Sequence, residues 1–181
     1  MESWLSNEIM SKIKVIKNFL KPEEFMFLKN SIIAIGSPTV HPTFNWFLTK
    51  KLNEGNECKE YENIQFVHNF YKGCFPQSDK IHDLNAILNI LNPKALIRIK
   101  ANLTMRTEKQ IVFGMHTDTD FNNTTGIYYL NTNNGETIFE NGKRIKSEEN
   151  TFVSFPSQIK HSGTTNTCDQ PFRAVINFNY I

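Results

Sequence analysis

The chain has 181 residues and a mass of 21.0 kDa, which suits one globular domain, and we expect a single domain over residues 1–181. Hydrophobic residues make up 39% of the sequence and aromatic residues 12%, which is enough for a core and excludes a disordered chain. The net charge of +2 is too small for the broad basic surface that drives non-specific nucleic-acid binding. Nucleic acid therefore stays possible as a substrate but has no support from the charge.

The expected location of the protein is the cytoplasm, with no membrane partner. No apolar run reaches the roughly 18 residues of a membrane span, and Glu2 and Glu8 lie where a signal peptide needs a basic start and an apolar stretch. Cys58, Cys74 and Cys168 are odd in number and far apart, which supports neither a disulfide framework nor a thiolate zinc site. We expect reduced thiols. The sequence gives no prediction of oligomeric state.

The first part of the chain predicts a strand and two helices. Residues 12–16 alternate charged and β-branched side chains, as in a half-exposed strand. A helix should begin at Pro22 and end before residues 36–38, because apolar residues recur at helical spacing at Phe25, Leu28 and Ile32. Ser78 is a plausible N-cap for a second helix, which ends at residues 92–93 and has an apolar stripe of Ile81, Leu84, Leu88 and Leu91.

Residues 39–77 are aromatic and irregular, and only residues 64–70 have the pattern of a strand. Long irregular segments often carry recognition residues, so this stretch is a candidate substrate lid. A layer that covers the β core is an equally good interpretation.

After Pro93 the pattern changes to about eight short strands separated by turn residues. The Asn141–Gly142 pair predicts a tight hairpin. The predicted fold is mainly β with N-terminal helices (α+β): a closed barrel or jelly roll over residues 94–181, with the helical and irregular part, 1–93, packed outside. The predicted strands are 95–103, 110–116, 124–131, 136–140, 143–147, 151–155, 159–163 and 172–180.

The most informative motif is His116-Thr117-Asp118, at the end of a predicted strand. Side-chain alternation puts His116 and Asp118 on one face, where both could reach one metal ion, although such a pair alone also fits a surface loop. His161 follows a later strand and turn and supplies a third candidate ligand. Two histidines and one carboxylate leave coordination positions open, as in non-haem Fe(II) oxygenases. We expect iron, and zinc is possible with the same ligands.

Arg173 lies in the apolar last strand, where an arginine is costly unless an anion pairs with it. Its planar guanidinium suits the distal carboxylate of a dicarboxylate co-substrate, and a structural ion pair is the alternative. On strand 95–103, Arg98, Lys100 and Asn102 share one face, which points either into the barrel or to water. The other histidines fit plainer roles, a core position for His68 and an exposed one for His82.

Two further segments lie between Asp118 and His161. Residues 126–131 read Gly-Ile-Tyr-Tyr-Leu-Asn, and residues 134–139 read Asn-Gly-Glu-Thr-Ile-Phe. With the motif residues above, residues 94–181 resemble the Fe(II)- and 2-oxoglutarate-dependent dioxygenases, especially the prolyl-4-hydroxylase-like branch. The second segment is similar to that family's Gly-Gly-x-Thr-x-Phe motif, with Asn134 in place of the first glycine. The beginning of the chain, residues 16–25, also resembles the way such domains start.

The resemblance implies a double-stranded β-helix with Fe(II) held by His116, Asp118 and His161. It also implies that Arg173 and Tyr129 bind the C5 carboxylate of 2-oxoglutarate, and that Asn102 contributes a further hydrogen bond to the co-substrate. The implied activity is O₂-dependent hydroxylation of a C–H bond in a peptide or small molecule, with release of succinate and CO₂. The alternatives are a non-catalytic, metal-containing jelly-roll binding module and a nucleic-acid oxidative dealkylase.

Overall fold

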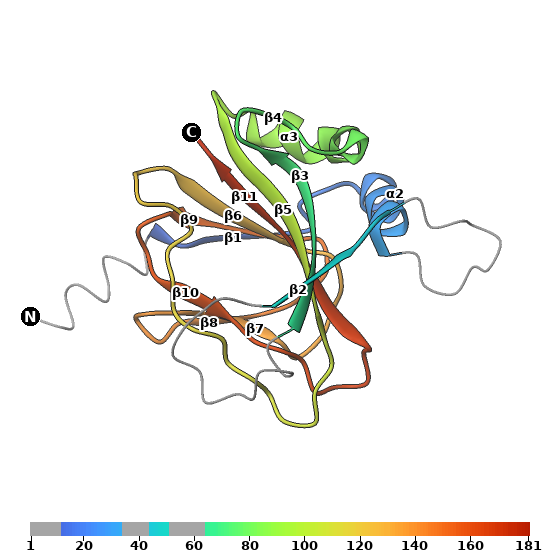
Figure 1. Ribbon diagram of the computed structural model, residues 1–181, viewed down its shortest axis with the longest axis vertical. Helices are drawn as coiled ribbons and strands as arrows, with labels where there is room; N and C mark the ends of the chain where they lie inside the picture. Colours follow the sequence, from blue (N-terminus) through green and yellow to red (C-terminus); the bar gives the residue numbers. More distant parts are fainter. Residues whose placement is uncertain (1–11, 34–43, 51–63) are drawn as a thin grey trace, which may run out of the picture.

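The computed structural model describes residues 12–33, 44–50 and 64–181. Two antiparallel β-sheets and two helical segments make up this part of the chain (Figure 1). No helix in these residues is both long and apolar enough to cross a membrane. Cys74 and Cys168 are free thiols, and Cys58 lies outside the described residues.

The larger sheet has the strand order β1-β9-β6-β11-β5-β3-β2, and β4 pairs with β3. The smaller sheet has the order β10-β7-β8. The strands of the larger sheet are β1 (Lys14–Lys17), β2 (Phe47–Lys50), β3 (Ile64–Lys72), β4 (Phe75–Pro76), β5 (Leu96–Met105), β6 (Thr124–Tyr129), β9 (Thr151–Pro156) and β11 (Phe172–Tyr180). Those of the smaller sheet are β7 (Glu136–Phe139), β8 (Arg144–Lys146) and β10 (His161–Gly163).

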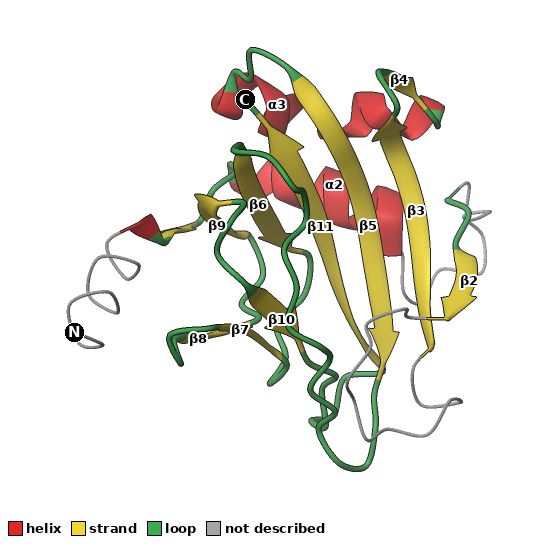
Figure 2. Cartoon of the chain, turned by 60° about the vertical axis from the view of Figure 1, so that its left-hand side comes forward, coloured by secondary structure: helices red, strands yellow, loops and turns green. Residues whose placement is uncertain are grey.

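The two sheets face each other, and the helices α2 (Pro22–Ile33) and α3 (Asn85–Leu91) cover the outer face of the larger sheet (Figure 2). The predicted double-stranded β-helix with helices packed outside is therefore confirmed. The predicted hairpin is also present, because Gly142 adopts a positive φ of 83° in the turn that joins β7 to β8. Strand alternation on β5 is as predicted: Ile99, Ala101 and Leu103 are buried against the helices.

One predicted strand is wrong. Residues 110–116 form no continuous strand, and two isolated bridges, Val112 to Thr164 and His116 to His161, join them to the β10 region. The partner strand β10 has only three residues, so it offers few backbone groups for a longer ladder. Between the bridges, the Ser162 hydroxyl donates to the carbonyl of Phe113 and takes the place of a backbone donor.

The second predicted helix is present but begins as a 3-10 helix, Asp79–Leu84, before it continues as α3. The Ser78 hydroxyl accepts from the Lys80 amide at 3.1 Å, and the Ser78 carbonyl accepts from the Ile81 amide at 3.2 Å. The 3-10 turn has three residues per turn, so the buried stripe runs at a spacing of three residues. It consists of Ile81, Leu84 and Ile87, and the predicted Leu88 and Leu91 are only partly buried.

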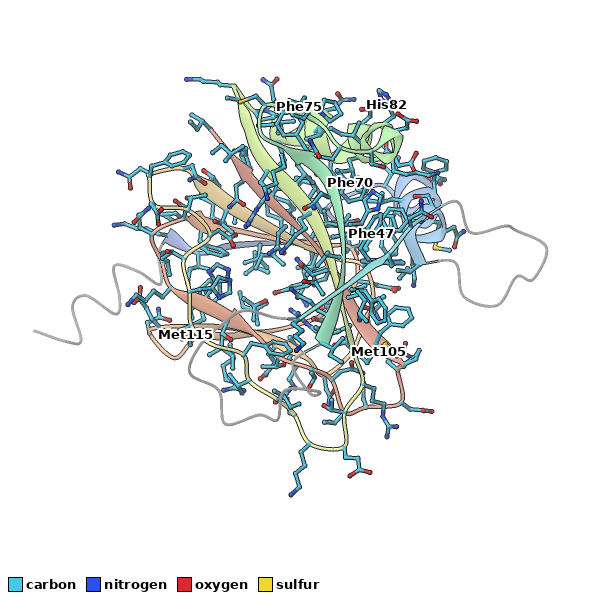
Figure 3. The ribbon with its side chains drawn as sticks, in the orientation of Figure 1. Phe47, Phe70, Phe75, His82, Met105 and Met115 are labelled. Atoms are coloured by element: carbon cyan, nitrogen blue, oxygen red, sulfur yellow. The ribbon has the colours of Figure 1, made fainter. Side chains whose placement is uncertain are left out.

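The described part of residues 39–77 is neither a separate lid nor a separate covering layer: β2, β3 and β4 extend the larger sheet beyond β5, and residues of β2 and β3 line the cavity between the sheets. Phe44 and Phe70 are buried in the cluster between the larger sheet and the helices, and Figure 3 labels Phe70 there. The expectation of a single strand in this segment is wrong, because two further strands of the segment, β2 and β4, pair with β3. β4 has only two residues, and β2 reads Phe-Leu-Thr-Lys, so neither strand shows an alternating pattern. Residues 39–43 and 51–63 lie outside the described residues.

The two other described histidines, His68 and His82, do not line the barrel interior. His68 is buried, and its Nδ1 atom lies 2.7 Å from the Asn45 carbonyl, as expected for a core histidine. His82 is exposed on the helical side of the molecule (Figure 3). Residue His41 lies outside the described residues.

Asn150 ties the N-terminal segment to the barrel. Its side chain bonds both backbone groups of Leu20 at 2.9 Å, and it accepts from the Tyr128 hydroxyl at 2.9 Å. Its φ of 55° lies in the left-handed region, which asparagine tolerates better than alanine. We expect Asn150→Ala to lower the free energy of unfolding by about 3 kcal/mol, since it leaves buried polar groups unpaired.

Tyr128→Phe is the matched control for this change. It removes one hydrogen bond from Asn150 and should cost about 1 kcal/mol in denaturant unfolding. Equal destabilisation by the two substitutions would contradict the role of Asn150 as an anchor.

Candidate metal centre

A cavity of about 470 Å³ opens between the two sheets. The larger sheet supplies its floor through alternate residues of β5 and β11, and β10 and residues 113–118 form the opposite wall. Arg98, Lys100, Asn102 and Thr104 of β5 line it, together with Arg173, Val175 and Asn177 of β11. The polar face of β5 therefore points into the barrel, which settles the question that its sequence left open.

The backbone brings the two candidate histidine ligands together. His116 and His161 form an antiparallel bridge in which each amide donates to the other's carbonyl at 3.0 Å. Their ring centroids lie 4.7 Å apart, and His116 Nε2 lies 3.8 Å from Asp118 Oδ1. One ligand atom from each of the three side chains falls within 4.8 Å of the others. The predicted ligand set is thus assembled at one end of the cavity, in a form that can hold one metal ion.

Two side chains from the floor hold the carboxylate of Asp118. Arg98 Nη2 lies 2.9 Å from Asp118 Oδ1, and the side-chain Nδ2 of Asn179 donates to Asp118 Oδ2 at 3.2 Å. Arg98 Nε also donates to the side-chain Oδ1 of Asn179 at 3.1 Å, so the two supporting side chains hold each other in place. Burial by itself would raise the pKa of Asp118, but Arg98, His161 and the Asn179 hydrogen bond hold it below its ordinary value. The carboxylate is kept in the charged form that a metal ion requires.

Arg173 lies toward the other end of β11 and is almost fully buried, with 6% of its surface exposed. Its Nε donates to the Ser147 hydroxyl at 2.7 Å, and its Nη2 donates to the Thr137 hydroxyl at 3.2 Å. Within the described parts of the chain, no carboxylate forms an ion pair with it. A buried guanidinium with neutral partners needs an anion, and the cavity is where one can reach it.

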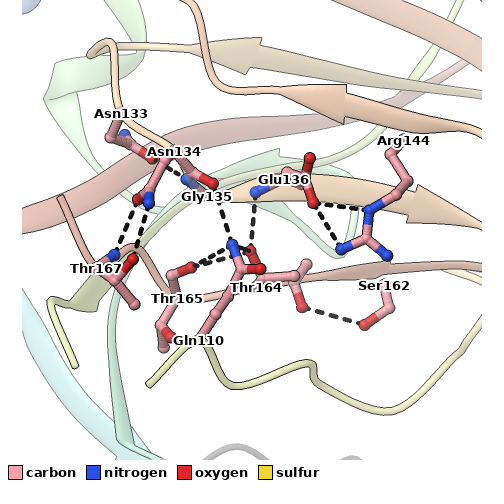
Figure 4. Close-up of polar contacts among 11 residues, drawn as sticks. Gln110, Asn133, Asn134, Gly135, Glu136, Arg144, Ser162, Thr164, Thr165 and Thr167 are labelled. Atoms are coloured by element: carbon pink, nitrogen blue, oxygen red, sulfur yellow. Dashed lines mark hydrogen bonds and ion pairs between the residues drawn. The ribbon is translucent and has the colours of Figure 1, made fainter. Parts of the chain in front are cut away.

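Two glycines lie against the Arg173 side chain, and Gly135 is much the closer of the two. A Cβ at Gly135 would lie 2.5 Å from the Cδ of Arg173, and one at Gly163 would lie 3.4 Å from its Nη1. Asn134 does not adopt a positive φ. Its side-chain Oδ1 accepts from the backbone amide of Thr167 at 2.9 Å (Figure 4) and from that of Cys168 at 3.1 Å. The asparagine thus fixes the turn beside Gly135, and the departure from the family motif leaves the arginine site intact.

The two other predicted co-substrate residues lie in different places. Tyr129 is fully buried behind Arg173, with its ring 5.6 Å from the guanidinium carbon and its hydroxyl donating to Thr137 at 2.8 Å. Burial raises the pKa of the Tyr129 phenol against the opposing effect of Arg173, so this phenol stays protonated. Asn102 lines the cavity, and its buried Oδ1 has no hydrogen-bond partner within residues 12–33, 44–50 and 64–181. Direct contact of either residue with a co-substrate stays a prediction.

Sequence reasoning missed three residues that support the site. Asn179 could have been found, since it has the same strand parity as Arg173 and shares its face of β11. Thr137 belongs to the motif at residues 134–139. Only the three-dimensional fold shows that its hydroxyl accepts hydrogen bonds from both Tyr129 and Arg173. Ser147 follows β8 and has no signal in the sequence that separates it from other loop serines.

The architecture is the double-stranded β-helix fold of the 2-oxoglutarate- and Fe(II)-dependent oxygenases, prolyl 4-hydroxylases included. No protein-family model matches the chain, and no curated protein matches it by sequence. The similarity to solved structures therefore rests on the fold, with the His116, Asp118 and His161 set present in this chain.

Three solved structures illustrate the similarity. A 2OG-Fe(II) oxygenase-family oxidoreductase from Burkholderia pseudomallei matches with a TM-score of 0.65 and 12% identity, over 99% of this chain and 90% of its own. The viral collagen prolyl hydroxylase of Paramecium Bursaria Chlorella virus-1, a 2OG complex, matches with a TM-score of 0.57 and 16% identity, over 93% and 94%. The α-ketoglutarate-dependent epimerase SnoN from nogalamycin biosynthesis matches with a TM-score of 0.64 and 11% identity, over 99% and 83%.

Proposed function

We propose that the protein is an Fe(II)- and 2-oxoglutarate-dependent oxygenase that hydroxylates a C–H bond of a peptide or small molecule. One observation supports this most strongly. A metal-ligand set of two histidines and a carboxylate shares a cavity with a buried arginine that no carboxylate of the described residues neutralises. The first feature is the ligand set of non-haem Fe(II) oxygenases, and the second is suited to the far end of a dicarboxylate.

The residues present fit both groups. His116, Asp118 and His161 would hold the metal ion, with Asp118 contributing one negative charge. Arg173 would bind the C5 carboxylate of 2-oxoglutarate. Between these two ends, the floor of the cavity has buried polar atoms without a hydrogen-bond partner among the described residues, Asn102 Oδ1, Thr104 Oγ1 and Asn177 Oδ1. Buried polar groups of this kind normally have a partner, which a bound polar ligand or water would provide.

When bound, Fe(II) would support the oxidative decarboxylation of 2-oxoglutarate by O₂ to succinate and CO₂, coupled to hydroxylation of a substrate C–H bond. The chain itself supplies binding, orientation and exclusion of water. Arg98 and Asn179 fix the orientation of the Asp118 carboxylate, which sets where the ligand atom lies. Phe113, Ile127 and Val175 provide an apolar lining that keeps bulk water from the reacting centre.

Formation of succinate from 2-oxoglutarate distinguishes an oxygenase from a non-catalytic binding module. With Fe(II), ascorbate, O₂ and 2-oxoglutarate, we expect the protein to form succinate slowly even without a prime substrate, and to form much less when His116 is replaced by Ala. Mass spectrometry of the succinate formed is the measurement. Tight zinc or iron binding without succinate formation would favour a non-catalytic metal-containing module.

A substitution beside Arg173 tests the co-substrate assignment without touching its charge. In Gly135→Ala, the new methyl group would collide with Arg173 Cδ, so we expect 2-oxoglutarate affinity to fall roughly tenfold while metal affinity stays unchanged. Gly163→Ala is the matched control, because its methyl group meets the guanidinium at an ordinary contact distance and should have a much smaller effect. Titration calorimetry measures Mn(II) binding to each variant and then 2-oxoglutarate binding to the Mn(II)-loaded variant. Equal 2-oxoglutarate affinities in the two variants would contradict the assignment.

A further inference from the structure

The cavity carries more positive charge than the metal site and the co-substrate require. Its described lining includes five basic side chains, Lys50, Lys72, Arg98, Lys100 and Arg173, against one carboxylate, that of Asp118. Arg98 is already engaged with Asp118, and the proposed function assigns Arg173 to 2-oxoglutarate. Lys100, on the central floor strand β5, has no assigned role.

Lys100 lies in the middle of a polar row across the floor. In the strand register it pairs with Asn177 of β11 on one side and with Asn69 of β3 on the other, and all three side chains line the cavity. Lys100 is only partly exposed, and among the described residues no carboxylate forms an ion pair with it. Its neighbour Asn177 has a buried Oδ1 atom that accepts no hydrogen bond from the described part of the chain. The row therefore presents one cation and one vacant acceptor side by side.

The electrostatic surroundings of Lys100 are those of a cation that lacks a counter-ion. Burial and the neighbouring Arg98 and Lys72 lower the pKa of Lys100 to about 8, although Asp118 acts in the opposite direction. An anion at the ammonium group would offset this repulsion and further favour the charged form. A lysine acts as a compact point charge, so it suits a carboxylate or a phosphate group equally.

We propose that Lys100 binds an anionic group, a carboxylate or a phosphate, of a small-molecule substrate, with Asn177 Oδ1 accepting an N–H or O–H of the same molecule. This inference rests on the proposed function and adds the substrate class. Lys100 shares β5 with Arg98, two residues away on the same face, which supports Asp118. An anchor in this position holds the substrate close to the metal centre. The cavity of about 470 Å³, which must also hold the co-substrate, suits a compact molecule.

The test uses three small probes with one methyl group each: acetate, methylphosphonate and neutral acetamide. The protein is loaded anaerobically with Mn(II) and saturated with 2-oxoglutarate, and the paramagnetic relaxation of each probe's methyl protons reports binding near the metal. In wild type, we expect whichever anion binds more tightly, acetate or methylphosphonate, to show about tenfold stronger relaxation than acetamide. The reason is that a hydrogen bond to a charged group contributes about 1.5–3 kcal/mol. The ratio of acetate to methylphosphonate identifies the anion class.

Three variants complete the experiment. Lys100→Met should lose the preference for the anion, and Lys100→Arg should retain it. Lys109→Met, an exposed lysine outside the cavity lining, should behave as wild type. Thermal unfolding of each variant verifies that the chain is folded.

Several results would overturn the inference. One is equal relaxation of acetate and acetamide in wild type. A second is an anion effect unchanged in Lys100→Met, which would mean an adventitious ion only. A third is a large loss of 2-oxoglutarate affinity in Lys100→Met, which would assign the lysine to the co-substrate. Failure of the proposed function looks different, since wild type would then bind no Mn(II) at this site or no 2-oxoglutarate.

Discussion

Replacing Arg173 with Met is expected to weaken 2-oxoglutarate binding by roughly a hundredfold, the effect typical of removing one partner from a buried, hydrogen-bonded charge pair. The guanidinium is buried among the hydroxyls of Ser147 and Thr137, and it is positioned to meet an anion from the cavity. Metal affinity should stay within about twofold of wild type, because Arg173 lies away from the ligand set and the effects of separate sites add. Titration calorimetry with the Mn(II)-loaded protein measures both affinities.

Arg144→Met is the matched control for this prediction. Arg144 is exposed and pairs with Glu136 at 2.6 Å, so its loss should leave 2-oxoglutarate binding unchanged. Arg173→Lys should recover part of the affinity, since an ammonium keeps the charge but not the planar fork. The assignment of Arg173 would be wrong if Arg173→Met and Arg144→Met bound 2-oxoglutarate equally well.

The second large effect concerns the metal. Asp118→Asn keeps the shape of the side chain but removes its charge, and we expect Fe(II) or Mn(II) affinity to fall by roughly a hundredfold or more, since even residues that merely support a ligand change affinity 10- to 100-fold. The change also leaves Arg98 without its anionic partner, so a positive charge faces the metal site without compensation. Electron paramagnetic resonance of bound Mn(II) provides the measurement.

Asp120→Asn tests whether the effect belongs to position 118. Asp120 lies in the same loop but is exposed, and its substitution should leave metal binding intact. Unchanged Mn(II) affinity in Asp118→Asn would show that the metal, if bound, uses other ligands.

The sequence predicted the parts of this protein that follow from strand alternation and short motifs. The fold class, the faces of β5 and the ligand set of His116, Asp118 and His161 all rest on patterns within a few residues of one another or on the family resemblance. The structure adds the reason for the convergence of the histidines: a backbone bridge joins residues that are 45 positions apart, from 116 to 161.

Other features needed the three-dimensional fold. The pairing of Arg98 with Asp118 joins β5 to a loop, and the strand pattern alone is equally consistent with an Arg98 side chain that faces water. The 3-10 start of the second helix depends on hydrogen bonds of Ser78 that a 3.6-residue pattern does not reveal. The break-up of the predicted strand 110–116 depends on the shortness of its partner β10, which is a property of a distant segment.

We propose that the cavity between the two sheets holds Fe(II) and 2-oxoglutarate together. The most direct measurement is an anaerobic titration of the Fe(II)-loaded protein with 2-oxoglutarate, following the weak visible metal-to-ligand charge-transfer band. We expect the band to appear in wild type, to vanish in His116→Ala, and to require a far higher 2-oxoglutarate concentration in Arg173→Ala. Absence of the band in wild type that binds zinc tightly would contradict the oxygenase assignment and favour a metal-containing binding module.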